Sequence, residues 1–225
     1  MKIDVLTLFP EMFQGYINNS IMKKALEKKL VEINIINFRD YSPLNNKQVD
    51  DTPYGGGAGM VLRIEPIFNC LDSLDTSDAH IILLSPEGKT FNQEIAKTLK
   101  NDYKHLIIIC GHYEGFDERI KTRVDEIISI GDYILTGGEI PALAIMDSIT
   151  RLIPGVIREE SLASESFNNN LLDYPTYTKP AEYRGLKVPV VLLSGHHENI
   201  LKYRSKMQIE KTKRLRPDLM ENKDE

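Results

Sequence analysis

Short runs of aliphatic and β-branched residues alternate with amphipathic stretches through the first two thirds of the chain. The runs predict buried strands over residues 3–8, 31–38, 79–84, 106–110 and 126–130. Apolar residues three or four apart predict helices over residues 20–30, 65–74, 92–99, 117–124 and from 139 to about 152. Strands that alternate with helices in this way indicate an α/β fold with a mainly parallel sheet.

The pattern changes after Pro154. Residues 157–170 are rich in Ser, Glu and Asn and have no sustained apolar period, which is typical of a mobile linker. An irregular segment with two prolines and two tyrosines follows, then the apolar run 188–193, which suits a buried strand, and then a helical stretch to about Leu215. We therefore expect an α/β domain at 1–156, a linker at 157–172 and a small C-terminal domain at 173–225.

Three glycine-bearing segments are the main candidates for chemistry: YGGGAGM (54–60), CGHYEG (110–115) and SIGDYILTGGEIPAL (129–143). The last two follow predicted strands, and α/β sheets bind ligands at the carboxyl ends of their strands. Neither matches the phosphate-binding patterns GxGxxG or GxxxxGK[ST]. Each alone is more typical of a turn, but their repetition predicts a pocket with main-chain walls, where glycine lets the backbone approach a flat nucleoside closely.

Charge is unevenly distributed, although the net charge is −5. Residues 1–172 carry 17 Lys and Arg against 25 Asp and Glu, whereas residues 173–217 carry 10 against 4. The densest stretch, 202–216, has seven basic residues and one acidic residue. Such a module suits phosphate binding, because phosphate contacts depend on the local field. The alternative is a solvated amphipathic helix without a partner.

The remaining polar residues give weaker signals. Only two cysteines and no secretion-signal pattern favour reduced thiols in the cytoplasm, and no apolar run is long enough to span a bilayer. No Cys/His group has zinc spacing, and the pair His196-His197 indicates the start of a helix. For His112 we favour packing over ligand contact. Asp173, which begins an ordered segment after the linker, is either a cap, a solvated charge or a general base.

Seven segments, in this order and spacing, closely resemble bacterial tRNA (guanine-N1)-methyltransferases of the TrmD type: TLFPEMF, VDDTPYGGGAGM, LLSPEG, CGHYEGFDER, SIGDYILTGGEIPAL, LLDYPTYTKP and PVVLLSGHH. The resemblance covers residues 1 to about 217. It implies a SPOUT-type parallel sheet with a deep trefoil knot, an exception to the rule that chains avoid knots, plus a small helical C-terminal domain. It also implies an obligate homodimer with active sites built from both chains.

The resemblance further implies a reaction and a site. S-adenosylmethionine would methylate N1 of guanosine 37 in tRNA, beside the anticodon and after another guanosine, and Mg²⁺ would be required although the sequence shows no carboxylate cage. Asp173 matches the family's general base. Arg158, or Arg151 as the alternative, matches the cation proposed to stabilise the guanine oxygen. The residues matching the cofactor site are Leu84, Ser85, Pro86, Gly111, Tyr113, Glu114, Gly115, Ser129, Ile130, Gly131, Asp132, Tyr133, Ile134, Leu135, Gly137, Gly138 and Pro141.

Three other functions are compatible with parts of these patterns. A second enzyme hypothesis is a SPOUT methyltransferase acting on ribose 2′-OH or ribosomal RNA. A binding hypothesis is an RNA-binding protein that keeps the pocket only as structure, but Asp173 and the glycine loops disfavour it. A generic nucleotide-binding α/β protein would bind ATP more tightly than S-adenosylmethionine.

Overall fold

The computed structural model describes residues 1–158, 161–162, 165–167 and 169–221. These residues form two compact units, Met1–Ile157 and Arg158–Glu225, each of which is considered by itself. The predicted linker, 157–172, lies partly outside the described residues. Within the described part of the chain, no helix is both long enough and apolar enough to cross a membrane.

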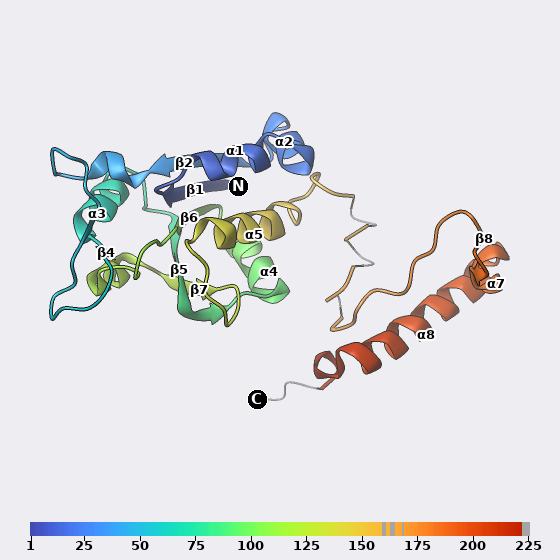
Figure 1. Ribbon diagram of the computed structural model, residues 1–225. Coiled ribbons are helices and arrows are strands. Elements are labelled where there is room, and N and C mark those ends of the chain that lie inside the picture. The colour runs from blue at the N-terminus through green and yellow to red at the C-terminus, as the bar shows by residue number, and fades with distance from the viewer. Residues whose placement is uncertain (159–160, 163–164, 168, 222–225) are drawn as a thin grey trace. The chain divides into compact units, whose positions relative to one another are not determined.

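A five-stranded parallel sheet forms the centre of the first unit (Figure 1). All five strands predicted from the apolar runs are present. In spatial order they are β2 (Glu32–Asn37), β1 (Lys2–Thr7), β6 (His105–Ile109), β5 (Ala79–Thr90) and β7 (Glu126–Ser129). The predicted parallel α/β architecture is therefore confirmed.

Both faces of the sheet are buried, which explains why its strands are apolar runs rather than strict alternations of apolar and polar residues. Side chains of a strand point alternately to opposite faces. In β6, Leu106 and Ile108 accordingly join one core, whereas Ile107 and Ile109 join the other. All four are fully buried.

Helices cover each face. The first core is covered by α1 (Glu11–Ile17), α2 (Ser20–Glu27), α4 (Gln93–Asp102) and α5 (Glu139–Thr150). The second is covered by the 3₁₀ helix η1 (Phe38–Tyr41), by α3 (Ile64–Asp72) and by the 3₁₀ helix η2 (Glu118–Arg123). The Asn92 side chain accepts a 3.0 Å hydrogen bond from the Ile95 amide and so caps the start of α4.

Three details of the first unit differ from the sequence-based expectation. Helix α1 was not predicted; Pro10 directly precedes it, where a fixed φ is tolerated. The helix predicted over 117–124 is the 3₁₀ helix η2. The long loop after Asp40 contains a short strand, β3 (Asp50–Asp51), which pairs with β4 (Val61–Leu62) in antiparallel fashion.

Both cysteines are buried free thiols, Cys70 in the second core and Cys110 in the first. Burial raises the pKa of both, that of Cys70 to about 12. Both thiols therefore stay protonated at neutral pH, and reactive cysteine chemistry is not their role.

The described residues of the second unit form one long helix and several short elements. They are the antiparallel pair β8 (Glu182–Tyr183) and β9 (Leu186–Lys187), α7 (Val190–Leu193), α8 (His197–Leu215) and the 3₁₀ helix η3 (Pro217–Leu219). The apolar run 188–193 was expected to be a buried strand, which is wrong: it forms α7, and Val190 and Leu193 are exposed. The helix start predicted at His196-His197 is confirmed.

Candidate functional site

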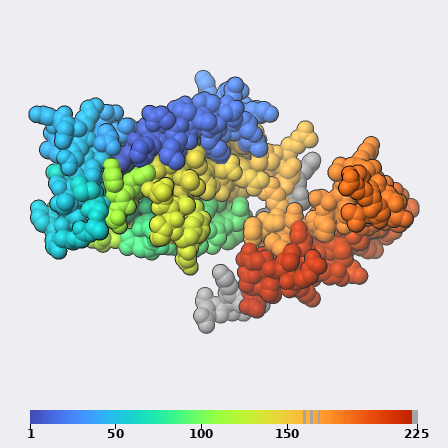
Figure 2. Space-filling view, viewed as in Figure 1, coloured from blue at the N-terminus to red at the C-terminus, as the bar shows by residue number. Residues whose placement is uncertain are grey.

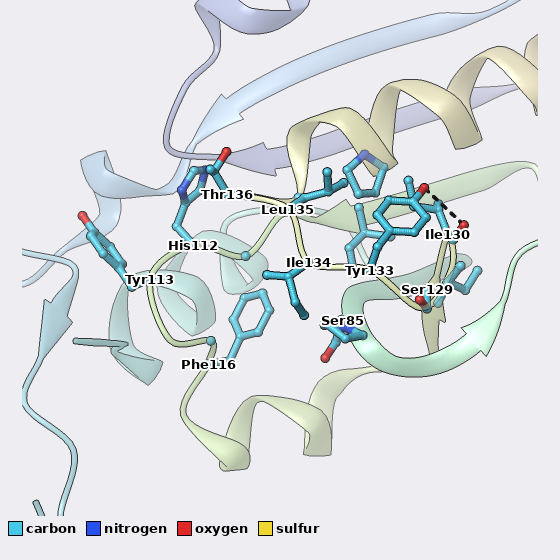
Figure 3. A pocket seen from close by; sticks show the side chains of 18 of the residues that line it. Ser85, His112, Tyr113, Phe116, Ser129, Ile130, Tyr133, Ile134, Leu135 and Thr136 are labelled. Carbon is cyan, nitrogen blue, oxygen red and sulfur yellow. Dashed lines mark hydrogen bonds between the residues drawn. The ribbon is translucent and has the colours of Figure 1, made fainter. Parts of the chain in front are cut away.

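A pocket of about 300 Å³ opens in the first unit at the carboxyl ends of β6 and β7 and beside an interruption in β5. Figure 3 shows the loops that follow β6 and β7 around it, and the yellow-green loop after β7 reaches the surface in Figure 2. The lining residues are Leu84, Ser85, Pro86, Gly111, His112, Tyr113, Glu114, Gly115, Phe116, Ile128, Ser129, Ile130, Gly131, Tyr133, Ile134, Leu135, Thr136, Gly137, Gly138 and Pro141.

The wall from β5 exists because that strand is interrupted. Its pairing with β7 shifts register between Leu84 and Lys89. Pro86 lies within the shifted segment and has no N–H for a ladder, so such interruptions are its usual place in a strand. The interruption frees Ser85 and Pro86 from regular pairing, and both line the pocket.

The loops after β6 and β7 are held together by a close backbone approach, although β5 lies between their strands in the sheet. The Gly138 amide donates a 2.9 Å hydrogen bond to the Gly111 carbonyl. A Cβ at Gly138 would lie 2.7 Å from the Cys110 Cα and 2.8 Å from the Gly111 nitrogen, so only glycine fits there. In the same loop Gly131 has φ +145°, a conformation that side chains disfavour.

The structure brings the predicted cofactor residues together around one cavity, with the exception of Asp132, which is exposed and does not line it. Their role in binding a cofactor stays a prediction. Four lining residues were not predicted as cofactor contacts: His112, Phe116, Ile128 and Thr136. Each is adjacent in the chain to a predicted residue, which is the signal that would have found them.

A buried carboxylate contacts His112, one of the residues that line the pocket. Glu139, the first residue of α5, is 1% exposed; its Oε1 accepts a 2.6 Å hydrogen bond from the Thr7 hydroxyl, and its Oε2 lies 2.7 Å from His112 Nε2. The His112 ring also lies 4.7 Å from the Phe9 ring, between centroids. His112 therefore packs, as expected, but it also lines the pocket. Neither Glu139 nor Thr7 was predicted to belong to the site.

The first glycine segment, YGGGAGM (54–60), reaches the pocket loops through its end. The Glu114 amide donates to the Met60 carbonyl at 2.9 Å, and the Leu62 amide donates to the Gly115 carbonyl at 2.9 Å. Its start, Tyr54, is fully exposed. Of the two carboxylates before it, Asp51 pairs with Arg63 at 3.0 Å and anchors the segment to α3's N-terminal side.

Asp173 belongs to the second unit and is held by helix α8. Lys211 Nζ donates to Asp173 Oδ1 at 2.8 Å and to its carbonyl oxygen at 3.0 Å. The Ser166 hydroxyl donates to the same Oδ1 at 3.2 Å. The Lys211 hydrogen bond is the main cause that lowers the pKa of the Asp173 carboxyl below its ordinary value, so this group is ionised at neutral pH.

The other predicted catalytic residue, Arg158, is the exposed first residue of the second unit. The described contacts do not join it to Asp173. Within the described residues, no group of three or more His, Cys, Asp or Glu side chains is arranged to hold a metal ion.

Fold and pocket together define an α/β protein with a nucleoside-sized, backbone-walled site at the carboxyl edge of a parallel sheet. A sequence model of the family "tRNA (Guanine-1)-methyltransferase TrmD" matches residues 1–222. The chain belongs to this family.

Curated relatives span nearly the whole chain, and each is named tRNA (guanine-N(1)-)-methyltransferase. The protein of Malacoplasma penetrans is 59% identical over 97% of this chain and 96% of its own length. That of Macrococcus caseolyticus is 55% identical over 99% and 92%. That of Mycoplasma capricolum is 54% identical over 98% and 92%.

Proposed function

We propose that this protein transfers a methyl group from S-adenosylmethionine to N1 of guanosine 37 in tRNA, next to the anticodon. The observation that carries the proposal is the match of the whole chain to a family of this activity, with relatives above half identity. The pocket also supports it, because the residues expected to bind the donor surround one cavity. We place the reaction in the cytoplasm, which suits two free thiols.

The shape and the lining of the pocket support binding of the donor. Gly111 and Gly138 leave a wall of backbone in which a Cβ would clash, which is how a protein approaches a flat ring closely. Leu84, Ile130 and Leu135 add apolar surface, and the main chain beside them supplies hydrogen-bonding groups. When bound, the sulfonium of the donor supplies an activated methyl group, so the protein's task is alignment.

The acceptor needs a base. Guanine N1 carries a proton and is a poor nucleophile until that proton is removed. Asp173 is ionised and lies on a segment held by α8, so it suits this role. Removing the proton shifts negative charge toward the guanine oxygen, where a cation stabilises the transition state. We assign that role to Arg158, whose exposed side chain is available for substrate.

The basic face of the second unit suits the tRNA backbone. Helix α8 spans most of the basic stretch, and Lys202, Lys206 and Lys213 lie along one side of it together with Glu210. Lysines arranged in this way gain affinity by releasing counterions from phosphates. We propose that this helix binds tRNA.

We further propose that the glycine loops belong to a SPOUT-type trefoil knot. The support is topological: β6 and β7 are separated by β5 in the sheet, yet the loops that follow them meet at the bond between Gly138 and Gly111. In a trefoil knot the chain has to pass through one of its own loops, and the contact between the loops after β6 and β7 is where we propose that this happens.

A homodimer with shared active sites is the assembly that we propose. Large apolar side chains are exposed on the first unit around α1 and the start of α5, among them Phe9, Met12 and Ile140, and also Ile134 at the pocket. Exposed apolar groups of this size are typical of interfaces. Light scattering is expected to give a mass of twice the 25.7 kDa of one chain; a monomer at assay concentration would contradict the shared-site proposal.

Mg²⁺ has no evident place in this scheme. The described residues of one chain offer no cluster of three ligands, so we route no catalytic step through a metal.

The product identifies the reaction. With S-adenosylmethionine and a tRNA transcript that carries guanosine at position 37, nucleoside analysis is expected to yield 1-methylguanosine. Recovery of a 2′-O-methyl nucleoside would instead support the alternative, a SPOUT methyltransferase that acts on ribose. No methylated nucleoside from tRNA, but label in ribosomal RNA, would reject the tRNA substrate.

A further inference from the structure

Lys211, a basic residue of α8, is bonded to the protein itself and so differs from a lysine that is free to bind phosphate. Its ammonium group makes two hydrogen bonds to Asp173, one to the side chain and one to the main chain. It is 28% exposed, whereas Lys202 and Lys206 are about 70% exposed. A side chain that is partly buried and already bonded differs from the flexible lysines that usually meet phosphates.

The residue next to Lys211 anchors the same segment. The Thr212 hydroxyl accepts a 3.0 Å hydrogen bond from the Leu172 amide, and Thr212 itself is fully buried. Consecutive residues of one helix therefore fix consecutive residues of the segment that carries Asp173. This double attachment restrains the backbone of Asp173 as well as its side chain.

The two oxygens of Asp173 are used unequally. Lys211 and Ser166 both donate to Oδ1. Among the described residues, no donor contacts Oδ2, and the side chain is 46% exposed. Lys211 and Ser166 therefore anchor one oxygen, and the described residues leave the other without a donor.

We propose that Lys211 is a positioning residue for the methyl transfer: it holds Asp173 ionised and oriented with Oδ2 toward guanine N1. This inference rests on the proposed function, in which Asp173 is the general base. In this arrangement the ammonium group acts through Asp173 and does not contact the reacting atoms. Because Lys211 lies within the basic stretch, the competing role is a simple phosphate contact.

Lys211 is expected to set the pH dependence of methyl transfer through Asp173. Asp173 acts as a base only when ionised, so the turnover rate falls as pH drops through its pKa. The facing charged group is Lys211 from α8, Ser166 being neutral, and Lys211 lowers that pKa. Removing the ammonium charge raises the pKa, and the acidic limb of the rate profile then moves to higher pH.

The test compares Lys211→Met with Lys213→Met, an exposed lysine two residues further along α8. In Lys211→Met, kcat is expected to fall about tenfold. This is a fraction of the roughly 10²–10⁴-fold rate enhancement that a positioned base supplies. The acidic limb of the pH–rate profile is expected to move to higher pH. Lys213→Met should raise only the KM for tRNA. An increase in KM for both variants, with kcat and the acidic limb unchanged, would reduce Lys211 to a phosphate contact and overturn the proposal.

Two further variants keep the interpretation unambiguous. Lys211→Arg retains the charge, so its acidic limb should stay at the wild-type pH; a limb that moves as far as in Lys211→Met would contradict the charge argument.

Asp173→Asn separates this inference from the proposed function. If that variant retains the wild-type rate, the general-base assignment fails; if it is inactive while Lys211→Met behaves like wild type, only the role of Lys211 fails. Thermal melts confirm that each variant is folded.

Discussion

Replacing Asp173 with asparagine is expected to lower the rate of methyl transfer by about 10²–10⁴-fold, the usual contribution of a positioned general base. The amide has nearly the same shape and keeps an oxygen for Lys211 and Ser166, so the segment on α8 should stay in place. It cannot, however, accept the proton from guanine N1. Rapid-quench assays at saturating tRNA measure the rate, and calorimetry measures binding of S-adenosylmethionine, which should be unchanged.

Asp78→Asn is a suitable control, because Asp78 is an exposed aspartate of the first unit that lies outside the pocket. It should behave like wild type in both assays. If Asp173→Asn abolished donor binding, or retained full activity, Asp173 would not be the base.

The second large effect is expected for Gly138→Ala. The new Cβ would lie within 3 Å of the backbone of Cys110 and Gly111, and backbone atoms cannot rotate away. The two loops must therefore separate and the Gly138–Gly111 hydrogen bond must break. Overpacking of this kind typically costs about 1–3 kcal/mol, and because the displaced atoms are the pocket wall, the affinity for S-adenosylmethionine should fall by at least about tenfold.

Gly15→Ala provides the matched control. Gly15 lies within α1, and a Cβ there meets no atom within 4 Å. Alanine is the better helix former by about 1 kcal/mol, so this variant should melt at the same or a higher temperature. Calorimetry that showed wild-type donor affinity for Gly138→Ala would mean that the donor binds elsewhere.

The parallel sheet was predictable because each strand is a local signal. The run 106–110 is entirely buried between two layers of helices, so its apolar character is visible in the sequence without knowing its neighbours. A short apolar run outside the sheet resembles a strand in sequence although it forms another structure. The run 188–193 has the composition of a strand but forms the short, exposed helix α7. Periodicity over six residues does not distinguish the two cases.

The parts of the pocket that come from one short stretch of sequence were predictable. Gly111 and Gly115 lie in one short segment, and the fold only has to bring that segment beside the loop after β7. The supporting hydrogen bonds are different: Thr7 and Glu139 are 132 residues apart, and Asp173 and Lys211 are 38 apart. Nothing local in the sequence indicates that a threonine at the end of β1 meets the first residue of α5. Such pairs follow from the topology of the sheet and the docking of a segment on α8.

The most direct test of the account is methyl transfer from labelled S-adenosylmethionine to two tRNA transcripts that differ only at position 37, guanosine or adenosine. The account predicts label only in the guanosine transcript, recovered as 1-methylguanosine. Equal labelling of both transcripts, or of neither, would contradict guanosine 37 as the target.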